Sequence, residues 1–286
     1  VIAPAMNDKM YESPATQEAI RILSTWSNIT MLECADGALA CGTSGRGRMQ
    51  EIDVIKAAIE YAITPKTLTD KHILITAGPT HEAIDPVRYI SNASTGKMGY
   101  ALVKSCLKRG AKVTLVTGPT HISVEGWKAF SPLTIRPVIS SSEMCEATVA
   151  EADSADICIL CAAVADFTPN TTANQKIKKE AGQTSLTLEL QTTTDIAAAL
   201  GKKKRKNQTL VGFALETHNE LANAERKMQA KNLDMIVLNS LQDQGAGFGV
   251  DTNKVTLLYP DGTQKKLPLK SKEEVADAII DAINPF

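Results

Sequence analysis

A group of polar and basic side chains lies among glycines between residues 85 and 99. Arg88 and Lys97 are positively charged there, and Asn92 carries an amide. Glycines let backbone N–H groups approach an anion, and the start of a helix favours negative charge. A basic side chain adds charge-assisted hydrogen bonds. The segment therefore predicts a phosphate or carboxylate site, although strand-loop-helix units with glycines also occur without a ligand.

This segment must be positioned by the elements on either side of it. The apolar run at 72–77 is typical of a buried strand, and the periodic stretch from Tyr100 to Val103 is typical of a helix. Gly78, Pro79 and Thr80 end the strand, so we expect a turn-rich loop from there to the helix. Ligands of open α/β sheets bind beyond the carboxyl ends of the strands, which is where this loop would lie.

From residue 71 onward, segments of strand and helix type alternate. The predicted strands are 72–77, 112–117, 133–138, 157–163, 186–190, 210–215, 235–238 and 254–259, and the predicted helices after the first are 142–152, 195–200, 220–231 and 272–283. The run 157–163 is apolar throughout, as in a strand covered on both faces. The alternation predicts an α/β fold with a doubly wound, mostly parallel, Rossmann-like sheet.

Residues 1–64 form a smaller unit. We expect a loop at 4–11, a helix at 13–25, a strand at 29–32, a glycine-rich loop at 37–47 and a helix at 52–62. One strand cannot build an α/β core, so this unit needs a further sheet or a partner chain. The linker composition near residue 65 predicts domains at 1–64 and 65–286. The sequence starts without a Met, and we expect an upstream domain.

The composition is that of an ordinary globular protein. Of 286 residues, 43% are hydrophobic and 22% charged, and the net charge of −1 gives no overall field to attract nucleic acid or acidic membranes. The basic run 202–206 is either a nucleic-acid or nuclear-localisation patch or the cationic end of a helix, and its position after 196–200 favours the helix end. With no signal peptide and no long apolar run, we expect a cytoplasmic protein.

The six cysteines show no zinc-binding spacing. They are Cys34, Cys41, Cys106, Cys145, Cys158 and Cys161, and the last two form a single CxxC inside an apolar strand. Reduced, buried thiols are the simpler interpretation.

Five motifs follow one another in the larger domain. They are ITAGPT at 75–80, DPVRYISNASTGKMG at 85–99, AAVADF at 162–167, KIKK at 176–179 and GFALET at 212–217. With them, the chain from residue 71 to its end resembles the phosphopantothenate-cysteine ligases, the second half of bifunctional coenzyme A biosynthesis proteins. PAMNDKMY at 4–11 and ACGTSGRGRM at 40–49 make residues 1–61 similar to the C-terminal part of the first half, the flavin-dependent phosphopantothenoylcysteine decarboxylases.

The resemblance implies two activities in coenzyme A biosynthesis. The ligase activates the carboxylate of phosphopantothenate with CTP and Mg²⁺, forming an acyl-cytidylate that cysteine then attacks. The full-length decarboxylase uses FMN to turn the product into phosphopantetheine. The implied partners are these small molecules and further copies of the chain: a homodimer through the ligase domain, and a larger homo-oligomer at full length. No nucleic-acid or membrane partner is expected.

The resemblance also assigns residues to CTP. They are Leu160, Cys161, Ala162, Asp166, Lys176, Thr194, Asp195, Ile196, Ala197, Phe213, Lys227 and Lys231. Lys176 would lie over the phosphates on a mobile loop, where its charge lets one anion attack another. Taken alone, residues 176–180 are better explained as a solvated charged loop and the two helical lysines as solvated side chains. Asp166 is equally a turn cap.

For the substrate, the resemblance assigns Asn92 to the acyl-cytidylate and Arg88 to the phosphate. Asn92 is otherwise a left-handed loop residue. The chain departs from the family pattern at Thr193 and Thr194, which replace Asn-Pro and lose the proline that fixes the turn before the helix. The metal ligands are not identified by the sequence.

In the smaller unit, the resemblance assigns Asn7 to the substrate carboxylate and Cys41 to proton donation in the decarboxylase. A lone cysteine is otherwise inert. The family's catalytic histidine and main flavin-binding elements precede Val1, so we do not expect this chain to decarboxylate by itself.

The sequence leaves two other interpretations. A nicotinamide-dependent dehydrogenase would share the sheet, but no GxGxxG opens the first turn and no acidic residue closes the second strand near 117–119. A non-catalytic regulatory or assembly subunit is the second. The presence of Asn92, Asp166 and Lys176 favours the enzyme.

Overall fold

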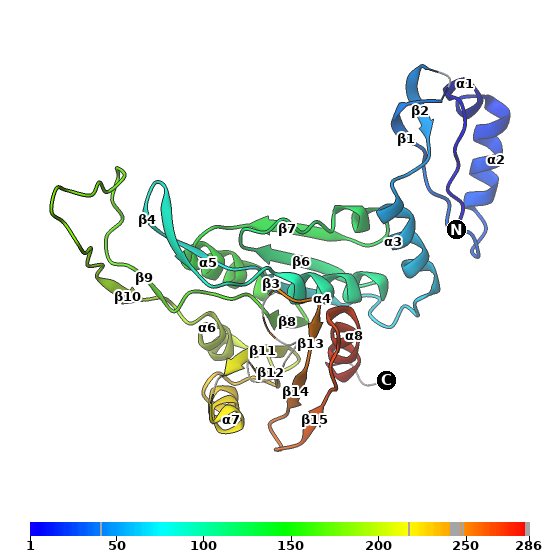
Figure 1. Ribbon diagram of the computed structural model, residues 1–286. Helices are drawn as coiled ribbons and strands as arrows, with labels where there is room; N and C mark the ends of the chain where they lie inside the picture. The colour runs from blue at the N-terminus through cyan, green and yellow to red at the C-terminus, as the bar shows by residue number, and fades with distance from the viewer. Residues whose placement is uncertain (41, 217, 241–246, 248, 284–286) are drawn as a thin grey trace.

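The computed structural model describes residues 1–40, 42–216, 218–240, 247 and 249–283. Its main body is an α/β sheet domain, and a small N-terminal unit stands at the upper right of Figure 1. This unit holds α1 (Asp8–Tyr11), α2 (Pro14–Ser24), β1 (Ala35–Ala38), β2 (Ser44–Arg48) and α3 (Ile52–Ile63). The last helix joins the two parts, because it packs on η1 (Glu125–Ala129) and α4 (Lys97–Lys108) of the sheet domain.

In the N-terminal unit the prediction is confirmed for the two longer helices and wrong for the strands. The segment 29–32 makes only an isolated bridge between Met31 and Ile2. Strands β1 and β2 instead form an antiparallel hairpin where a glycine-rich loop was expected. Glycine is depleted in strands, so its abundance concealed the hairpin. The expected loop at 4–11 ends in α1, because the Asn7 side chain accepts a hydrogen bond from the Lys9 N–H at 2.8 Å and caps the helix.

The sheet domain is built on an eight-stranded sheet within the described part of the chain. Its order is β15 (Gln264–Lys266), β14 (Val255–Leu258), β12 (Met235–Ser240), β11 (Thr209–Glu216), β8 (Ile157–Leu160), β3 (His72–Ala77), β6 (Lys112–Thr117), β7 (Leu133–Pro137). The six strands from β12 to β7 in this order run parallel to one another. Strand β14 pairs antiparallel with β12, and β15 pairs antiparallel with β14. The predicted α/β fold with a doubly wound, mostly parallel sheet is confirmed. Strand β8 is central as predicted, although it ends at Leu160 rather than Ala163.

Helices cover both faces of the sheet. On one face α4 packs against α8 (Lys272–Ile283), over a cluster that contains Ile75 and Ile159. On the other face α5 (Ser141–Ala152), α6 (Ile196–Lys203) and α7 (Glu220–Ala230) contribute to a second cluster around Leu74 and Cys158. All six residues of β3 are buried, because this strand has helices on both sides.

An arm extends to the left of the sheet in Figure 1. It consists of two antiparallel ladders, β4 (His81–Asp85) with β5 (Arg88–Ser91) and β9 (Phe167–Pro169) with β10 (Leu190–Thr192). The loop expected after Gly78 is therefore wrong for residues 81–91, where polar side chains concealed the strands. The strand expected at 186–190 lies instead at 190–192. Buried Glu82 anchors the arm, since its carboxylate accepts hydrogen bonds from the backbone and side chain of Ser141 at the start of α5.

The other predicted elements agree within a few residues. Helix α5 begins with a capping box formed by Ser140 and Glu143. Helix α6 ends in basic residues, which confirms that the run 202–206 closes a helix; Lys204 is not solvated there but pairs with Asp234 at 2.8 Å. Two short strands, β13 (Thr252–Asn253) and β16 (Lys270–Ser271), pair antiparallel, and β16 leads directly into α8.

The described cysteines are free thiols: Cys34, Cys106, Cys145, Cys158 and Cys161. Cys34, Cys106 and Cys158 are buried, as predicted, whereas Cys145 and Cys161 are only half-buried. Burial raises the pKa of Cys106 and of Cys158 to about 12, so both thiols stay protonated at neutral pH. None of the helices described has the length and apolar character needed to cross a membrane.

Candidate functional site

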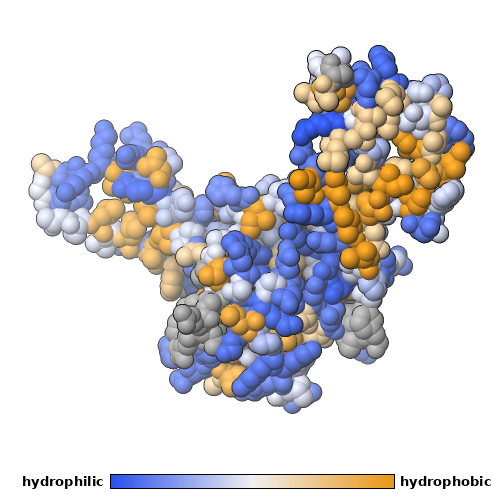
Figure 2. Space-filling model, turned by 45° about the vertical axis from the view of Figure 1, so that its right-hand side comes forward, coloured by the Kyte–Doolittle hydropathy of each residue, from blue (hydrophilic) through white to orange (hydrophobic). Residues whose placement is uncertain are grey.

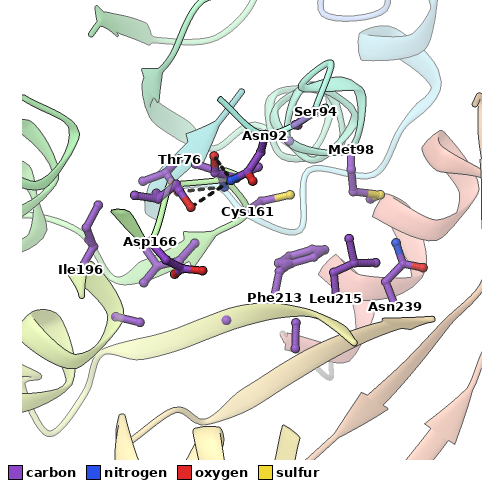
Figure 3. A pocket seen from close by; sticks show the side chains of 18 of the residues that line it. Thr76, Asn92, Ser94, Met98, Cys161, Asp166, Ile196, Phe213, Leu215 and Asn239 are labelled. Atoms are coloured by element: carbon purple, nitrogen blue, oxygen red, sulfur yellow. Dashed lines mark hydrogen bonds between the residues drawn. The ribbon is translucent and has the colours of Figure 1, made fainter. Parts of the chain in front are cut away.

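A cavity of about 630 Å³ lies at the carboxyl ends of β3, β8, β11 and β12 (Figure 3). The chain leaves β3 through α4 on one face of the sheet and reaches α6 on the other face after β8. Where the connections of neighbouring strands diverge in this way, they leave a crevice in which α/β proteins bind ligands. The volume is within the range of small-molecule sites.

The first turn of α4 forms one wall of the cavity. Gly99 lets this helix lie directly on β3, because a Cβ at that position would come within 2.5 Å of the Cβ of Ala77. Gly96 precedes the helix at a φ of 80°, a conformation that favours glycine, and lies against Gly78. The close packing places the positive end of the helix dipole at the cavity.

Asn92 lies beside this wall, just after β5. Its Nδ2 donates to the carbonyl oxygens of Ala163 at 3.1 Å and Val164 at 3.0 Å, which tie the arm to the loop after β8. The amide oxygen remains an acceptor for another group. Asn92 does not have a positive φ, so the left-handed loop interpretation is wrong.

The start of α6 forms the opposite wall. Asp195 caps this helix by accepting from the Ala198 N–H at 2.9 Å, and it pairs with Lys231 at 2.9 Å. Burial alone would raise the pKa of Asp195, but the hydrogen bonds from Lys231 and the backbone outweigh it and hold the pKa below its usual value. The turn survives the loss of Asn-Pro, because Thr193 hydrogen-bonds through its N–H to Asp166 O and through its hydroxyl to Ala165 O.

Most residues predicted to bind CTP or substrate line this one cavity. They are Asn92, Leu160, Cys161, Ala162, Asp166, Thr194, Asp195, Ile196, Ala197, Phe213, Lys227 and Lys231. Figure 3 shows that they come from different strand ends, with Asp166 and Ile196 at one end of the cavity and Phe213 toward the other. Burial raises the pKa of Cys161 to about 12, so its thiol is not a nucleophile.

Two predicted residues, Arg88 and Lys176, lie outside the cavity wall. Arg88 donates through Nε to Asp85 at 2.9 Å and through Nη2 to Ile177 O at 2.7 Å. Asp85 is buried and also accepts from the N–H groups of Val87 and Ile177, and the Arg88 guanidinium is the main reason that its pKa lies far below the usual value. Arg88 thus fastens the segment that carries the exposed Lys176 to the arm.

The cavity also has polar lining residues that were not predicted from the sequence, among them Asn239, Asn253 and Lys272. Lys272 is only 7% exposed and stands in the first turn of α8. A positive charge in the first turn of a helix is unfavourable, because it lies at the positive end of the helix dipole. This unfavourable position was the one sequence signal that could have identified Lys272 as a cavity residue. The two asparagines carry no comparable signal: Asn239 lies inside β12, and Asn253 ends the two-residue strand β13.

The residues expected to serve a decarboxylase lie in the N-terminal unit. Asn7 caps α1, which packs on β2. Cys41 falls outside the described residues. Both roles stay predictions.

Comparison with known families divides the chain between two of them. The family model described as the DNA/pantothenate metabolism flavoprotein C-terminal domain matches residues 68–286, and the flavoprotein family model matches residues 1–64. Together they account for nearly the whole chain.

Individual relatives are similar over the same length. The coenzyme A biosynthesis bifunctional protein CoaBC of Bacillus subtilis (strain 168) is 46% identical over 285 residues, which cover 99% of this chain and 68% of that protein. A cysteine/cysteine sulfinic acid decarboxylase from an unknown prokaryotic organism is 47% identical over 287 residues, covering 99% and 78%. The crystal structure of the C-terminal domain of CoaBC covers 77% of this chain and 96% of its own, at 38% identity and a TM-score of 0.62.

Proposed function

Because the chain belongs to the family of bifunctional coenzyme A biosynthesis proteins, we propose that its sheet domain joins cysteine to phosphopantothenate at the expense of CTP. One observation carries the proposal. Residues from separate segments of the sequence, including Asn92, Asp166, Asp195 and Phe213, line a single cavity at the point where the sheet connections diverge. A cavity assembled in this way suits a nucleotide with a second substrate beside it.

The reaction has two steps. In the first, a carboxylate oxygen of phosphopantothenate attacks the α-phosphorus of CTP, and the bond to the β-phosphate breaks to release pyrophosphate. In the second, the amine of cysteine attacks the acyl carbon, loses a proton and displaces CMP. The first step brings two anions together, so the site must supply positive charge and donors that stay fixed during the reaction.

The cavity supplies both. Four lysines and two aspartates line its described wall: Lys97, Lys227, Lys231, Lys272, Asp166 and Asp195. The amide oxygen of Asn92 is fixed by the two bonds that its nitrogen makes, so it can orient the intermediate at little entropic cost.

Mg²⁺ is the companion proposed for CTP. The described residues contain no group of three or more histidine, cysteine, aspartate or glutamate side chains that would hold a metal alone. A magnesium nucleotide needs only one or two protein carboxylates besides its phosphates, and Asp166 on the cavity wall fits that need. When bound, the ion would neutralise phosphate charge.

The flavoprotein family match at residues 1–64 implies FMN for the decarboxylase part of such proteins. The described residues of this segment form helices and one antiparallel hairpin, without the parallel sheet that carries a flavin in an α/β domain. They do not make an FMN site by themselves, and decarboxylation is proposed only for a protein that carries the rest of such a domain.

Lys176 is proposed to act from a lid. The segment 170–189 contains no helix or strand and is joined to the arm through hydrogen bonds such as Ala173 N–H to Ile84 O.

Apolar side chains are exposed on the arm, among them Tyr89 at 55% and Phe167 at 51%. These surfaces support the proposed homodimer through the ligase domain.

Pyrophosphate release tests the function. The protein is incubated with CTP, Mg²⁺, phosphopantothenate and cysteine, and omission of phosphopantothenate should abolish release. Lys176→Gln should lower turnover about 100-fold, because it removes a cation from the first step. Lys179→Gln, on the same exposed segment, is the matched control. No release from the unaltered protein would favour the alternative of a non-catalytic assembly subunit.

A further inference from the structure

The segment 170–189, which carries Lys176, has little burial of its own. It follows β9, runs beside β4 at the left of Figure 1 and ends at β10. Ala173, Ile177 and Gln183 are half-buried, and the other residues of the segment are exposed. A stretch with so few buried contacts depends on its hydrogen bonds to keep a defined position.

The first part of the segment is attached to β4 by neutral groups. The Thr172 hydroxyl donates to the carbonyl oxygen of Ala83 at 3.1 Å, and the Ala173 N–H donates to that of Ile84 at 3.0 Å. Both bonds precede Lys176 in the chain. They fix the start of the segment and leave the position of the lysine to the residues that follow.

Charged side chains hold Ile177, the residue directly after Lys176. Asp85 Oδ2 accepts from the Ile177 N–H at 3.1 Å, and Arg88 Nη2 donates to the Ile177 carbonyl oxygen at 2.7 Å. That N–H belongs to the planar peptide group that begins at the Cα of Lys176, so Asp85 fixes the backbone next to the lysine. Charge-assisted bonds are stronger than neutral ones, which makes this the firmest attachment of the segment.

Asp85 is the centre of this arrangement. Its side chain has no exposed surface, whereas that of Arg88 is 43% exposed. Besides the Ile177 N–H, the carboxylate accepts from the Val87 N–H through Oδ1 and from Arg88 through Oδ2. An ionised carboxylate only accepts hydrogen bonds, so it satisfies all of these donors. An amide in its place would turn hydrogens toward some of them.

The same hairpin leads to the cavity. Strand β5 begins at Arg88, and Asn92 follows its end. The Asn92 amide donates to the carbonyl oxygens of Ala163 and Val164 on the cavity wall. Lys176 is thus attached to the hairpin that carries Asn92, so the lysine moves together with the arm. A group held in this way loses less freedom when it takes its place in a transition state.

We propose that Asp85 is a positioning residue for the ligation: it holds the peptide group next to Lys176 on the arm, so that the arm presents the lysine to the phosphates of the nucleotide. Arg88 completes the attachment through the carbonyl oxygen of Ile177. Asp85 itself touches no substrate and acts only through Lys176. This inference rests on the proposed function.

A double-mutant cycle on the full chain tests the inference, with pyrophosphate release from CTP, Mg²⁺, phosphopantothenate and cysteine as the measurement. Asp85→Asn should lower turnover about tenfold in the otherwise unaltered protein and less than about twofold in the Lys176→Gln background, where no lysine remains to be positioned. Glu180→Gln removes an exposed carboxylate from the same segment and is the matched control, with turnover unchanged. Equal losses in the two backgrounds would show that Asp85 only stabilises the fold, and would overturn the inference.

Ile177→Pro is the second variant and guards against a folding defect in Asp85→Asn. Proline has no N–H, so this variant removes the bond to Asp85 and leaves the pair between Asp85 and Arg88 in place. The segment contains no helix or strand, so the midpoint of thermal unfolding should not fall, while turnover should fall as it does in Asp85→Asn. Normal turnover in Ile177→Pro would contradict the inference.

Hydrogen exchange separates this inference from the proposed function. In the protein without ligands, the Ile177 N–H should exchange about tenfold faster in Asp85→Asn than in the unaltered protein, because its acceptor is lost. Unchanged exchange would mean that Asp85 does not hold the segment. Faster exchange together with no pyrophosphate release from the unaltered protein would show that the attachment exists and that the proposed function fails.

Discussion

The N-terminal unit and the sheet domain use similar helical patterns but bury them very differently. Nine of the 12 residues of α4 are buried, whereas no residue of α2 is. In Figure 2 apolar groups spread over the surface of the N-terminal unit, and Ile22 and Trp26 are 42% and 52% exposed. The difference teaches that an amphipathic pattern identifies the face that needs burial and does not guarantee a surface to cover it.

Stability should therefore reside in the sheet domain. The N-terminal unit is attached mainly through α3, where Ala57 and Ala58 are buried and Tyr61 stacks on Phe130 at 5.7 Å. The two tryptophans report on the two regions separately, because Trp127 is buried in the sheet domain and Trp26 is exposed on the N-terminal unit. Each prediction below compares matched changes in the two regions.

The largest difference is expected for isoleucine truncation. Ile75→Ala, at a side chain without exposure, should lower the free energy of unfolding by about 2–5 kcal/mol through lost burial and a cavity. Ile22→Ala on α2 should change it by less than about 0.5 kcal/mol. Urea unfolding measures both changes, followed by Trp127 fluorescence in a Trp26→Phe background for Ile75→Ala and by Trp26 fluorescence in a Trp127→Phe background for Ile22→Ala.

The comparison would break if the two truncations cost the same. A large effect of Ile22→Ala would mean that α2 is covered in solution, by another copy of the chain for example, and the effect would then depend on protein concentration.

A smaller effect is expected at the ion pairs between α4 and α8. Asp277 accepts hydrogen bonds from Ser105, Lys108 and Arg109 at 2.7–2.8 Å. Asp277→Asn should cost about 1–3 kcal/mol at pH 7, because buried Arg109 loses one of its two carboxylate partners and keeps only Asp281. In the N-terminal unit Glu18→Gln should cause no measurable change, since the pair between Glu18 and Arg21 is exposed on both sides.

The pH dependence checks the cause. Burial alone raises the pKa of Asp277, but its three hydrogen bonds outweigh this and hold the pKa below its usual value. The folded pKa is thus lower than the unfolded value of about 3.9, and the stabilisation is complete above that pH and lost as the pH falls through the folded pKa. The difference between Asp277→Asn and the unaltered protein should shrink below about pH 4. A constant difference would indicate a packing defect.

The sequence predicts the sheet domain well for a physical reason. Strands such as 72–77 and 157–160 are buried on both faces, so their apolar character is continuous and easy to read. Hairpins β1–β2 and β4–β5 are stabilised by backbone pairing and long-range anchors, such as Glu82 on Ser141, and their residue types gave no strand signal.

The site was predicted only where a motif carried it. Asn92 and Asp166 stand in recognisable motifs and line one cavity. Asn239 and Lys272 reach the same cavity from β12 and α8, and only the folded sheet brings those elements together. Lys176 shows the reverse case: its motif is recognisable, yet its side chain lies outside the cavity wall, so its proposed role depends on movement.

The smallest effect concerns helix caps. The hydroxyl of Ser140 accepts from the Glu143 N–H at 3.2 Å within the capping box of α5, so Ser140→Ala should cost about 1 kcal/mol. Ser13 occupies the same position before α2, but its side chain makes no cap hydrogen bond, and Ser13→Ala should cost nearly nothing. The same urea titration compares them, with Trp127 as the reporter for the first and Trp26 for the second. If Ser13→Ala proved as costly as Ser140→Ala, the Ser13 side chain would cap α2 in solution. The N-terminal unit would then stabilise its own helix as the sheet domain does, and the contrast between the two regions would weaken.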